Sequence, residues 1–227
     1  MRVFHFLNET YALKTICEQR LKVSKFTDLN DPFEMYAPEL SSKAHRVLFK
    51  GFRKEMSKTT GLLCFSKSWN NPVLWSHYGD RHKGIALEFE VPNEILNDVN
   101  YVSQRLLFDP SGLNTEKLSK EDLRKILTTK FEHWKYEQET RIILPSDYYY
   151  EEDNLRYLNL DGNSLGIKLK GIIHGTLCQT TEKQIADSLP KGRSISLLKV
   201  RLAFRSFTVV QNKSIKLRRI EGKRKVN

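Results

Sequence analysis

The chain has 227 residues, of which 38 are Lys or Arg and 27 are Asp or Glu, so its formal net charge is +11 at pH 7. Apolar residues make up 39% and charged residues 29%, a composition that supports a buried core and excludes wholesale disorder. No apolar run reaches the ~18 residues of a membrane span. The positive charge favours an anionic partner, nucleic acid first.

Cysteine usage and the first residues of the chain favour a cytoplasmic protein. Cys17, Cys64 and Cys178 are odd in number and far apart, which is typical of reduced thiols rather than of a disulfide framework or a zinc site. Residues 1–10 lack the apolar segment of a secretory signal. The sequence also lacks the G-x-G-x-x-G, P-loop, H-E-x-x-H and G-x-S-x-G motifs, which disfavours Rossmann dehydrogenases, P-loop NTPases, zincins and α/β-hydrolases.

The first half of the chain predicts short strands that alternate with helices. Asn71 followed by Pro72 is typical of a helix cap and first turn. A longer helix has an apolar stripe at helical spacing, formed by Ala44, Val47, Leu48, Phe52 and Met56. In chain order we expect a strand over 3–6, a helix from about 10, an extended segment over 21–26, a turn over 29–32, a helix from 41 or 42 to about 56, a strand over 61–65, a short helix from 71 to 78, and strands over 84–89 and 100–104.

The second half continues the same mixture and ends in a basic segment. We expect a loop over 109–120, a helix capped by Ser119 with Leu123, Ile126, Leu127, Phe131 and Trp134 on one side, a strand over 139–144, a polar stretch over 148–153, a strand over 167–173, a helix capped by Thr180 or Thr181 that ends at 189, and strands over 195–204 and 207–210. Helices fall between strands without a regular βαβ order, so the sequence predicts a single α+β domain over 1–211 with a mixed or antiparallel sheet. Residues 212–227 are expected to form a frayed, solvated basic tail.

One charged cluster has a clear physical interpretation. If Glu137, Glu139 and Arg141 lie on one strand, the two-residue period places all three on the same face. These charges cannot be buried without compensation, so that face either is a solvent-exposed ladder of ion pairs or lines a polar pocket. The aromatic residues that flank it, Trp134 and Tyr136, favour the pocket, although both also fit ordinary packing.

Other polar residues have structural as well as functional interpretations. His5 fits a core histidine bonded to backbone, and the turn around Asn30 fits a simple Asx turn. His77 and His82 are poorly spaced for a shared ligand on one helix face, so no metal site is expected. Cys64 is expected to be a buried, inert thiol.

Six short motifs occur in a fixed order along the chain: residues 4–6 (Phe-His-Phe), 29–34 (Leu-Asn-Asp-Pro-Phe-Glu), 63–66 (Leu-Cys-Phe-Ser), 74–78 (Leu-Trp-Ser-His-Tyr), 82–84 (His-Lys-Gly) and 134–141 (Trp-x-Tyr-Glu-x-Glu-x-Arg). With these motifs the chain resembles the bacterial family of domain of unknown function 2971 (DUF2971). The resemblance extends from Met1 through residues 202–207. It implies no established activity.

A more distant resemblance carries a functional expectation. The order of a strand with a His, an aromatic residue in the middle of the chain and a Glu that opens a late strand is similar to ADP-ribosyltransferase-like folds, in particular toxins that modify nucleic acid bases. The matching positions are His5, Tyr78 or Phe65, and Glu139. Neither the arginine nor the Ser-Thr-Ser motif of that pattern can be placed, and Glu137 competes with Glu139. The likeness is one of fold, and a fold alone does not establish a function.

The resemblance implies NAD as a substrate and assigns roles to the matching residues. Cleavage of the nicotinamide–ribose bond develops positive charge, which a fixed carboxylate, Glu139, would stabilise. Tyr78 would stack on nicotinamide and His5 would bind the adenine-side ribose. Arg141 would orient Glu139 or hold a pyrophosphate oxygen. The catalytic set is therefore Glu139, Glu137 and Arg141, and the cofactor-binding set is His5, Phe6, Tyr78, Phe65, Ser66 and Asn30.

Three functions are therefore considered. The first is a transferase that uses NAD, with nucleic acid as a possible acceptor, in a bacterial toxin or phage-defence system. Nucleic acid would then bind a basic helix face and the tail through its phosphates, the helix residues being Lys43, Arg46, Lys50, Arg53 and Lys54. The second is a nucleic-acid-binding module without catalysis. The third is a metal-dependent nuclease or hydrolase that uses Asp31, Glu34, Glu137 and Glu139.

Overall fold

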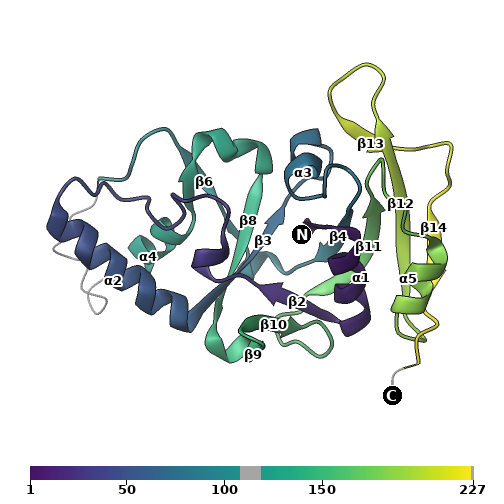
Figure 1. The fold of residues 1–227 in the computed structure, drawn as a ribbon, viewed down its shortest axis with the longest axis horizontal. Coiled ribbons are helices and arrows are strands. Elements are labelled where there is room, and N and C mark those ends of the chain that lie inside the picture. Colours follow the sequence, from purple (N-terminus) through teal and green to yellow (C-terminus); the bar gives the residue numbers. More distant parts are fainter. Residues whose placement is uncertain (108–118, 226–227) are drawn as a thin grey trace.

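A computed structural model describes residues 1–107 and 119–225 of the chain (Figure 1). The helices are α1 Glu9–Glu18, α2 Lys43–Thr59, α3 Pro72–His77, α4 Lys120–Leu127 and α5 Glu182–Ser188, with 3-10 turns η1 Phe26–Asp28, η2 Asn93–Ile95, η4 Glu132–Glu137 and η5 Ser146–Tyr148. The strands are β1 Arg2–Leu7, β2 Arg20–Val23, β3 Thr60–Ser66, β4 Ile85–Glu90, β5 Asn97–Asp98, β6 Asn100–Val102, β7 Thr129–Phe131, β8 Glu139–Pro145, β9 Tyr150–Glu152, β10 Leu155–Asn159, β11 Lys168–His174, β12 Ser194–Leu202, β13 Val209–Gln211 and β14 Arg218–Glu221.

A nine-stranded sheet organises the molecule. Its order is β13-β12-β11-β4-β1-β3-β8-β5, and β14 pairs with β12 beside this path. The β11–β12 pair is parallel, whereas the other pairs of this sheet are antiparallel. Two smaller sheets, β2-β10-β9 and β6-β7, complete the strands. The α+β class with a mixed, largely antiparallel sheet is confirmed.

The two faces of the large sheet bury different apolar clusters. On one face Val3, Leu63 and Leu87 belong to a continuous core that α1, α5, β2 and β10 cover. The opposite face carries two separate clusters. Phe4 and Phe6 pack against α3 in one of them, and the other lies under α2 and α4. Polar side chains of β3 and β8 lie on this opposite face, because Ser66 pairs with Glu139 and Cys64 with Arg141 in the strand register.

Several element ends form as the sequence predicts, through side-chain caps. Asn71 accepts a hydrogen bond from the Val73 N–H at the start of α3, and Ser119 accepts one from Asp122 at the start of α4. At α5, Thr181 and Gln184 form a reciprocal capping box. These caps satisfy N–H groups that have no partner within the helix.

Two predicted helix faces are wrong in detail. In α2 the buried side chains are Phe49 and Phe52, while Val47 is 64% and Leu48 50% exposed. The two phenylalanines pack into the cluster that contains Leu62, so this contact sets the rotation of the helix. The helix that starts at Lys120 ends at Leu127, so Phe131 and Trp134 do not belong to its face.

The C-terminal segment is better ordered than a frayed tail. Arg218–Glu221 forms β14, which pairs antiparallel with the start of β12 and buries Ile220. Pairing occurs because one apolar side chain of this segment reaches the core while its basic neighbours stay in water. The predicted loop over 109–120 falls mostly outside the described residues. Within the described ranges, no helix is both long and apolar enough to cross a membrane.

Candidate functional site

A cavity opens where β1 and β3 diverge. The two strands pair only between Phe4 and Ser66, whereas β1 pairs with β4 along its whole length. The space between them has a volume of about 230 Å³ and is called the β1–β3 cavity. Its walls also include parts of the turn over 24–30, of α3 and of the segment over 130–139. Sequence-distant segments therefore meet at one opening in the sheet.

The β1–β3 cavity contains nearly all of the residues predicted for a site. Those that line it are His5, Phe6, Asn30, Phe65, Ser66, Tyr78, Glu137 and Glu139. Arg141 does not line it and lies behind Glu139, only 1% exposed. The structure thus brings the predicted imidazole, aromatic ring and carboxylates together around one space.

His5 is fixed at the strand gap by a backbone contact. Its Nδ1 lies 3.0 Å from the carbonyl oxygen of Cys64, so this nitrogen donates the hydrogen bond. The ring also meets Phe65 edge to face. Burial lowers the pKa of His5, which outweighs the hydrogen bond to Cys64 and favours the neutral ring. The expectation of a histidine bonded to backbone is confirmed, and the same residue lines the cavity.

Arg141 holds two glutamates through all of its N–H groups. It donates to both carboxylate oxygens of Glu139 at 2.7 and 3.0 Å and to both oxygens of Glu34 at 2.6 and 3.0 Å. A further hydrogen bond of 2.8 Å goes to the carbonyl oxygen of Leu127. A guanidinium has five donors, so none remains for a ligand. Arg141 therefore orients Glu139, and the alternative role of holding a pyrophosphate is wrong.

Lys130 is a buried cation of the site that the sequence does not predict. Its side chain is 4% exposed, and its Nζ lies 2.6 Å from Glu137, 3.2 Å from Glu139 and 3.3 Å from Glu34. The apolar spacing predicts a helix that continues through Trp134, whereas the chain forms strand β7 at Lys130. The available signal was charge: the acids of the predicted cluster outnumber Arg141, so a second cation was required.

Glu137 reaches the cluster from outside the strand. It ends η4, and Gln138 adopts a left-handed conformation (φ 46°) before β8 begins. The expectation that Glu137 shares a strand with Glu139 and Arg141 is therefore wrong. A solvent-exposed ladder is also wrong, because Glu137 is 4% and Glu139 6% exposed. The left-handed residue turns the chain so that both carboxylates face Lys130.

Tyr78 connects Glu137 to the turn at Asn30. The Tyr78 hydroxyl donates to Glu137 Oε1 at 2.5 Å and accepts a hydrogen bond of 2.6 Å from the Asn30 side-chain amide. Burial, followed by the charge of Glu137, raises the pKa of Tyr78. Ser66 Oγ lies 2.6 Å from the Glu137 carbonyl oxygen and anchors the backbone beside it. Four of the predicted residues thus form one hydrogen-bonded wall.

The buried cluster has one more carboxylate than it has cations. Glu34, Glu137 and Glu139 face Lys130 and Arg141. Burial would raise the pKa of Glu139, but Arg141 and Lys130 outweigh it and lower that pKa to about 2. For Glu137, burial prevails and raises the pKa. Of these two carboxylates, Glu137, at the cavity wall, is therefore the one that takes up a proton more readily.

Glu34, Glu137 and Glu139 surround the side chains of Lys130 and Arg141 and are not arranged as metal ligands. No group of three or more His, Cys, Asp or Glu among the described residues is suited to hold a metal ion. Asp31 serves its turn, because its carboxylate accepts the Phe33 N–H at 2.9 Å. His77 Nδ1 lies 2.9 Å from the Tyr136 hydroxyl, and His82 stacks on Trp75.

Comparison with known proteins gives one result. Residues 74–142 match a family model described as protein of unknown function (DUF2971). The match supports the resemblance to DUF2971 and runs from α3 into β8, so it includes Tyr78, Lys130, Glu137, Glu139 and Arg141. The β1 and turn motifs lie before the matched residues. No curated protein and no solved structure is significantly similar to the chain.

Proposed function

We propose that the protein is an ADP-ribosyltransferase-like enzyme that cleaves the nicotinamide–ribose bond of NAD at the β1–β3 cavity. In this reaction the bond between the ribose carbon and the nicotinamide nitrogen breaks, and nicotinamide leaves with the electron pair. An acceptor nucleophile then bonds to the ribose carbon and loses its proton. The observation that carries the proposal is the convergence of His5, Tyr78, Glu137 and Glu139 on one cavity.

The charge of the cluster suits this chemistry. Nicotinamide in NAD is cationic, and its departure moves positive charge onto the ribose. A buried group of three carboxylates and two cations favours such a charge, since its own cations leave one carboxylate uncompensated. Glu139, held by Arg141 and Lys130, needs no reorganisation during the reaction. Glu137 would hold a ribose hydroxyl through the carboxylate lone pairs that Tyr78 and Lys130 leave open.

The size of the cavity limits which part of NAD it takes. Its volume of about 230 Å³ is below the ~300–1,000 Å³ of sites that enclose a whole drug-sized ligand. It would therefore hold the nicotinamide–ribose end, with the ring against Tyr78 and Phe65. The adenine half would lie outside the cavity. His5 would therefore not contact the adenine-side ribose, and would instead form part of the wall around the nicotinamide–ribose end.

The biological setting rests on the net charge and on the resemblance. A nucleic acid acceptor would fit the net charge of +11, and a role in a toxin or phage-defence system would fit the fold likeness. The alternative of a metal-dependent nuclease is not favoured, because Glu34, Glu137 and Glu139 are engaged by Lys130 and Arg141.

The test is incubation of the purified protein with NAD labelled in its adenylate part, together with nucleic acid or cell lysate. Free nicotinamide and labelled acceptor are measured. Wild type should release nicotinamide, and Glu139→Gln and Glu137→Gln should each reduce the rate by about 100-fold or more, as loss of an electrostatic group in an active site does.

Glu132→Gln is the matched control, because Glu132 also lies in η4 but is exposed. It should keep the wild-type rate. Full label transfer by Glu139→Gln would show that this residue is not catalytic. Absence of nicotinamide release by wild type with every acceptor would refute the proposed reaction.

A further inference from the structure

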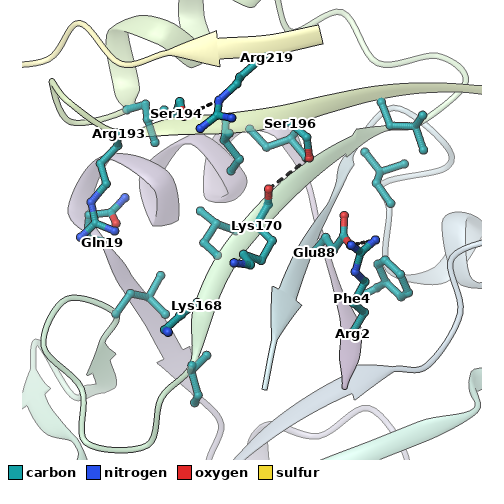
Figure 2. A pocket seen from close by; sticks show the side chains of 18 of the residues that line it. Arg2, Phe4, Gln19, Glu88, Lys168, Lys170, Arg193, Ser194, Ser196 and Arg219 are labelled. Carbon is teal, nitrogen blue, oxygen red and sulfur yellow. Dashed lines mark hydrogen bonds and ion pairs between the residues drawn. The ribbon is translucent and has the colours of Figure 1, made fainter. Parts of the chain in front are cut away.

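We propose that a second hollow in this protein binds the phosphate backbone of a single-stranded nucleic acid. This hollow, the β11–β12 groove, has a volume of about 1070 Å³ (Figure 2). It lies where β11 and β12 part: the two strands pair only over residues 171–174 and 196–199, and Lys168, Lys170, Arg193 and Ser194 precede the paired stretch. The groove is several times larger than the β1–β3 cavity and has different walls.

The walls of the groove are strongly basic. The acids that line it are Glu88 and Asp161. The cations that line it are Arg2, Lys168, Lys170, Arg193, Arg218 and Arg219. Phosphodiester groups are the ligands that such a series of Lys and Arg side chains binds most strongly, because each contact also releases counterions from the nucleic acid.

Two of the six cations are uncommitted. Four make ion pairs: Arg2 with Glu88, Lys170 with Glu90, Arg193 with Asp161 and Arg218 with Glu182. Lys168 and Arg219 make no ion pair with any residue that the structure describes. These two side chains, one from each side of the groove, therefore have full charge to offer to a phosphate.

Hydrogen bonds hold the side chains and strands that form the groove. Arg219 Nε donates to Ser194 Oγ at 2.7 Å, which directs the guanidinium across the start of β12. Ser196 Oγ donates to the Lys170 carbonyl oxygen at 3.1 Å and ties the two strands together. At Gly171 a Cβ would lie 2.5 Å from a carboxylate oxygen of Glu88, so glycine leaves room for this side chain in the groove.

One aromatic ring favours a single strand over a simple polyanion. Half-buried Trp69 lines the groove together with the basic residues, whereas Phe4 is part of its wall but is only 8% exposed. Bases of single-stranded nucleic acid stack on such a ring, whereas a duplex hides its base faces. Phe4 also lines the β1–β3 cavity, so a strand in the groove would end beside the proposed reaction site. Binding itself requires no NAD, and its test is independent of the proposed reaction.

The experiment measures fluorescence anisotropy of a labelled single-stranded oligonucleotide of mixed sequence at several salt concentrations, without NAD. The groove variant is Lys168→Gln/Arg219→Gln. The matched control is Lys120→Gln/Lys125→Gln, which removes two exposed charges from α4, outside the groove. Competition with unlabelled strand, duplex and inorganic polyphosphate of equal charge identifies the ligand.

The groove variant should bind about 10-fold more weakly or worse, and its slope of log affinity against log salt should fall by about 1.4, which is the value for two phosphate contacts to a single strand. The control should stay within about twofold of wild type. Equal losses in the two variants would refute a site in the groove. Absence of binding by wild type, or competition by duplex or polyphosphate as effective as that by single strand, would also refute the proposal.

Discussion

Arg141 and Glu34, which are 107 positions apart in the chain, form two parallel hydrogen bonds of 2.6 and 3.0 Å in the interior. Arg141 is 1% and Glu34 2% exposed. The pair connects β8 to the turn after η1 and thereby fixes the turn that carries Asn30 against the β1–β3 cavity. Its planar geometry depends on a guanidinium, which an ammonium group cannot reproduce.

Arg141→Lys should therefore destabilise the protein strongly although the charge is kept. Lysine has three donors and cannot serve two carboxylates and the Leu127 carbonyl oxygen in the same geometry. The expected loss is on the order of 3 kcal/mol, as for a broken buried ion pair, measured by urea unfolding at neutral pH. Arg193→Lys is the control: its ion pair with Asp161 is exposed and should contribute less than about 1 kcal/mol. Equal effects of the two substitutions would contradict this account.

Lys130→Met should also destabilise, because it leaves three buried carboxylates with Arg141 alone. Addition of Glu137→Gln to this variant removes one of those charges and should recover part of the lost free energy of unfolding. The coupling between the two substitutions should be about 1 kcal/mol or more, as for residues in one ion-pair network. Urea unfolding of wild type, both single variants and the double variant gives this value. A double variant no more stable than Lys130→Met would show that the ammonium does not compensate Glu137.

His174 should make stability depend on mildly acidic pH. It is 2% exposed and its Nε2 has no hydrogen-bond partner among the described residues. Burial, aided by Lys199, lowers its pKa from 6.5 to about 4. The unfolded chain therefore takes up the proton first, so the contribution of His174 is fully present above pH 6.5 and is lost as the pH falls toward 4. The full effect is on the order of 3 kcal/mol.

Comparison of wild type with His174→Gln tests this directly. Between about pH 7 and about pH 4.5 the free energy of unfolding should decrease more for wild type than for the variant, since glutamine does not titrate. The same fall in both proteins would show that other groups cause the pH dependence.

The fold was predictable where local chemistry decides it. The cap at Asn71 and the alternation of β8 follow from short-range rules. The predictions that were wrong concern features that depend on contacts between distant segments. Phe49 turns inward because Phe52 and Leu62 lie beside it, and Ile220 adds β14 because β12 offers a free edge.

Most residues of the site were predictable from the sequence, but the ion pairs and hydrogen bonds between them were not. The resemblance to ADP-ribosyltransferase-like folds singles out Glu139, and the aromatic residues Trp134 and Tyr136 before it favour a polar pocket over an exposed face. Lys130 could not be predicted, because its neighbours fit the end of a helix and nothing local shows that Glu34, 96 positions before it in the printed sequence, lies 3.3 Å from its ammonium. The left-handed Gln138, which brings Glu137 to the same cation, is likewise visible only in three dimensions.

If the β1–β3 cavity itself holds the nicotinamide–ribose end of NAD, NAD should stabilise the protein against heat, and this thermal shift is the most direct test of the proposed function. Ser24 lines the cavity and its side chain makes no hydrogen bond with the described residues, so Ser24→Leu should fill the space and keep the fold. Thr27→Leu, at an exposed position of η1, is the control. With NAD at about ten times its Kd, wild type and Thr27→Leu should melt about 3 °C higher or more. Ser24→Leu, folded and with an unchanged melting temperature in the absence of NAD, should show no shift. A shift in Ser24→Leu equal to that of wild type, or no shift in wild type at any NAD concentration, would contradict the account.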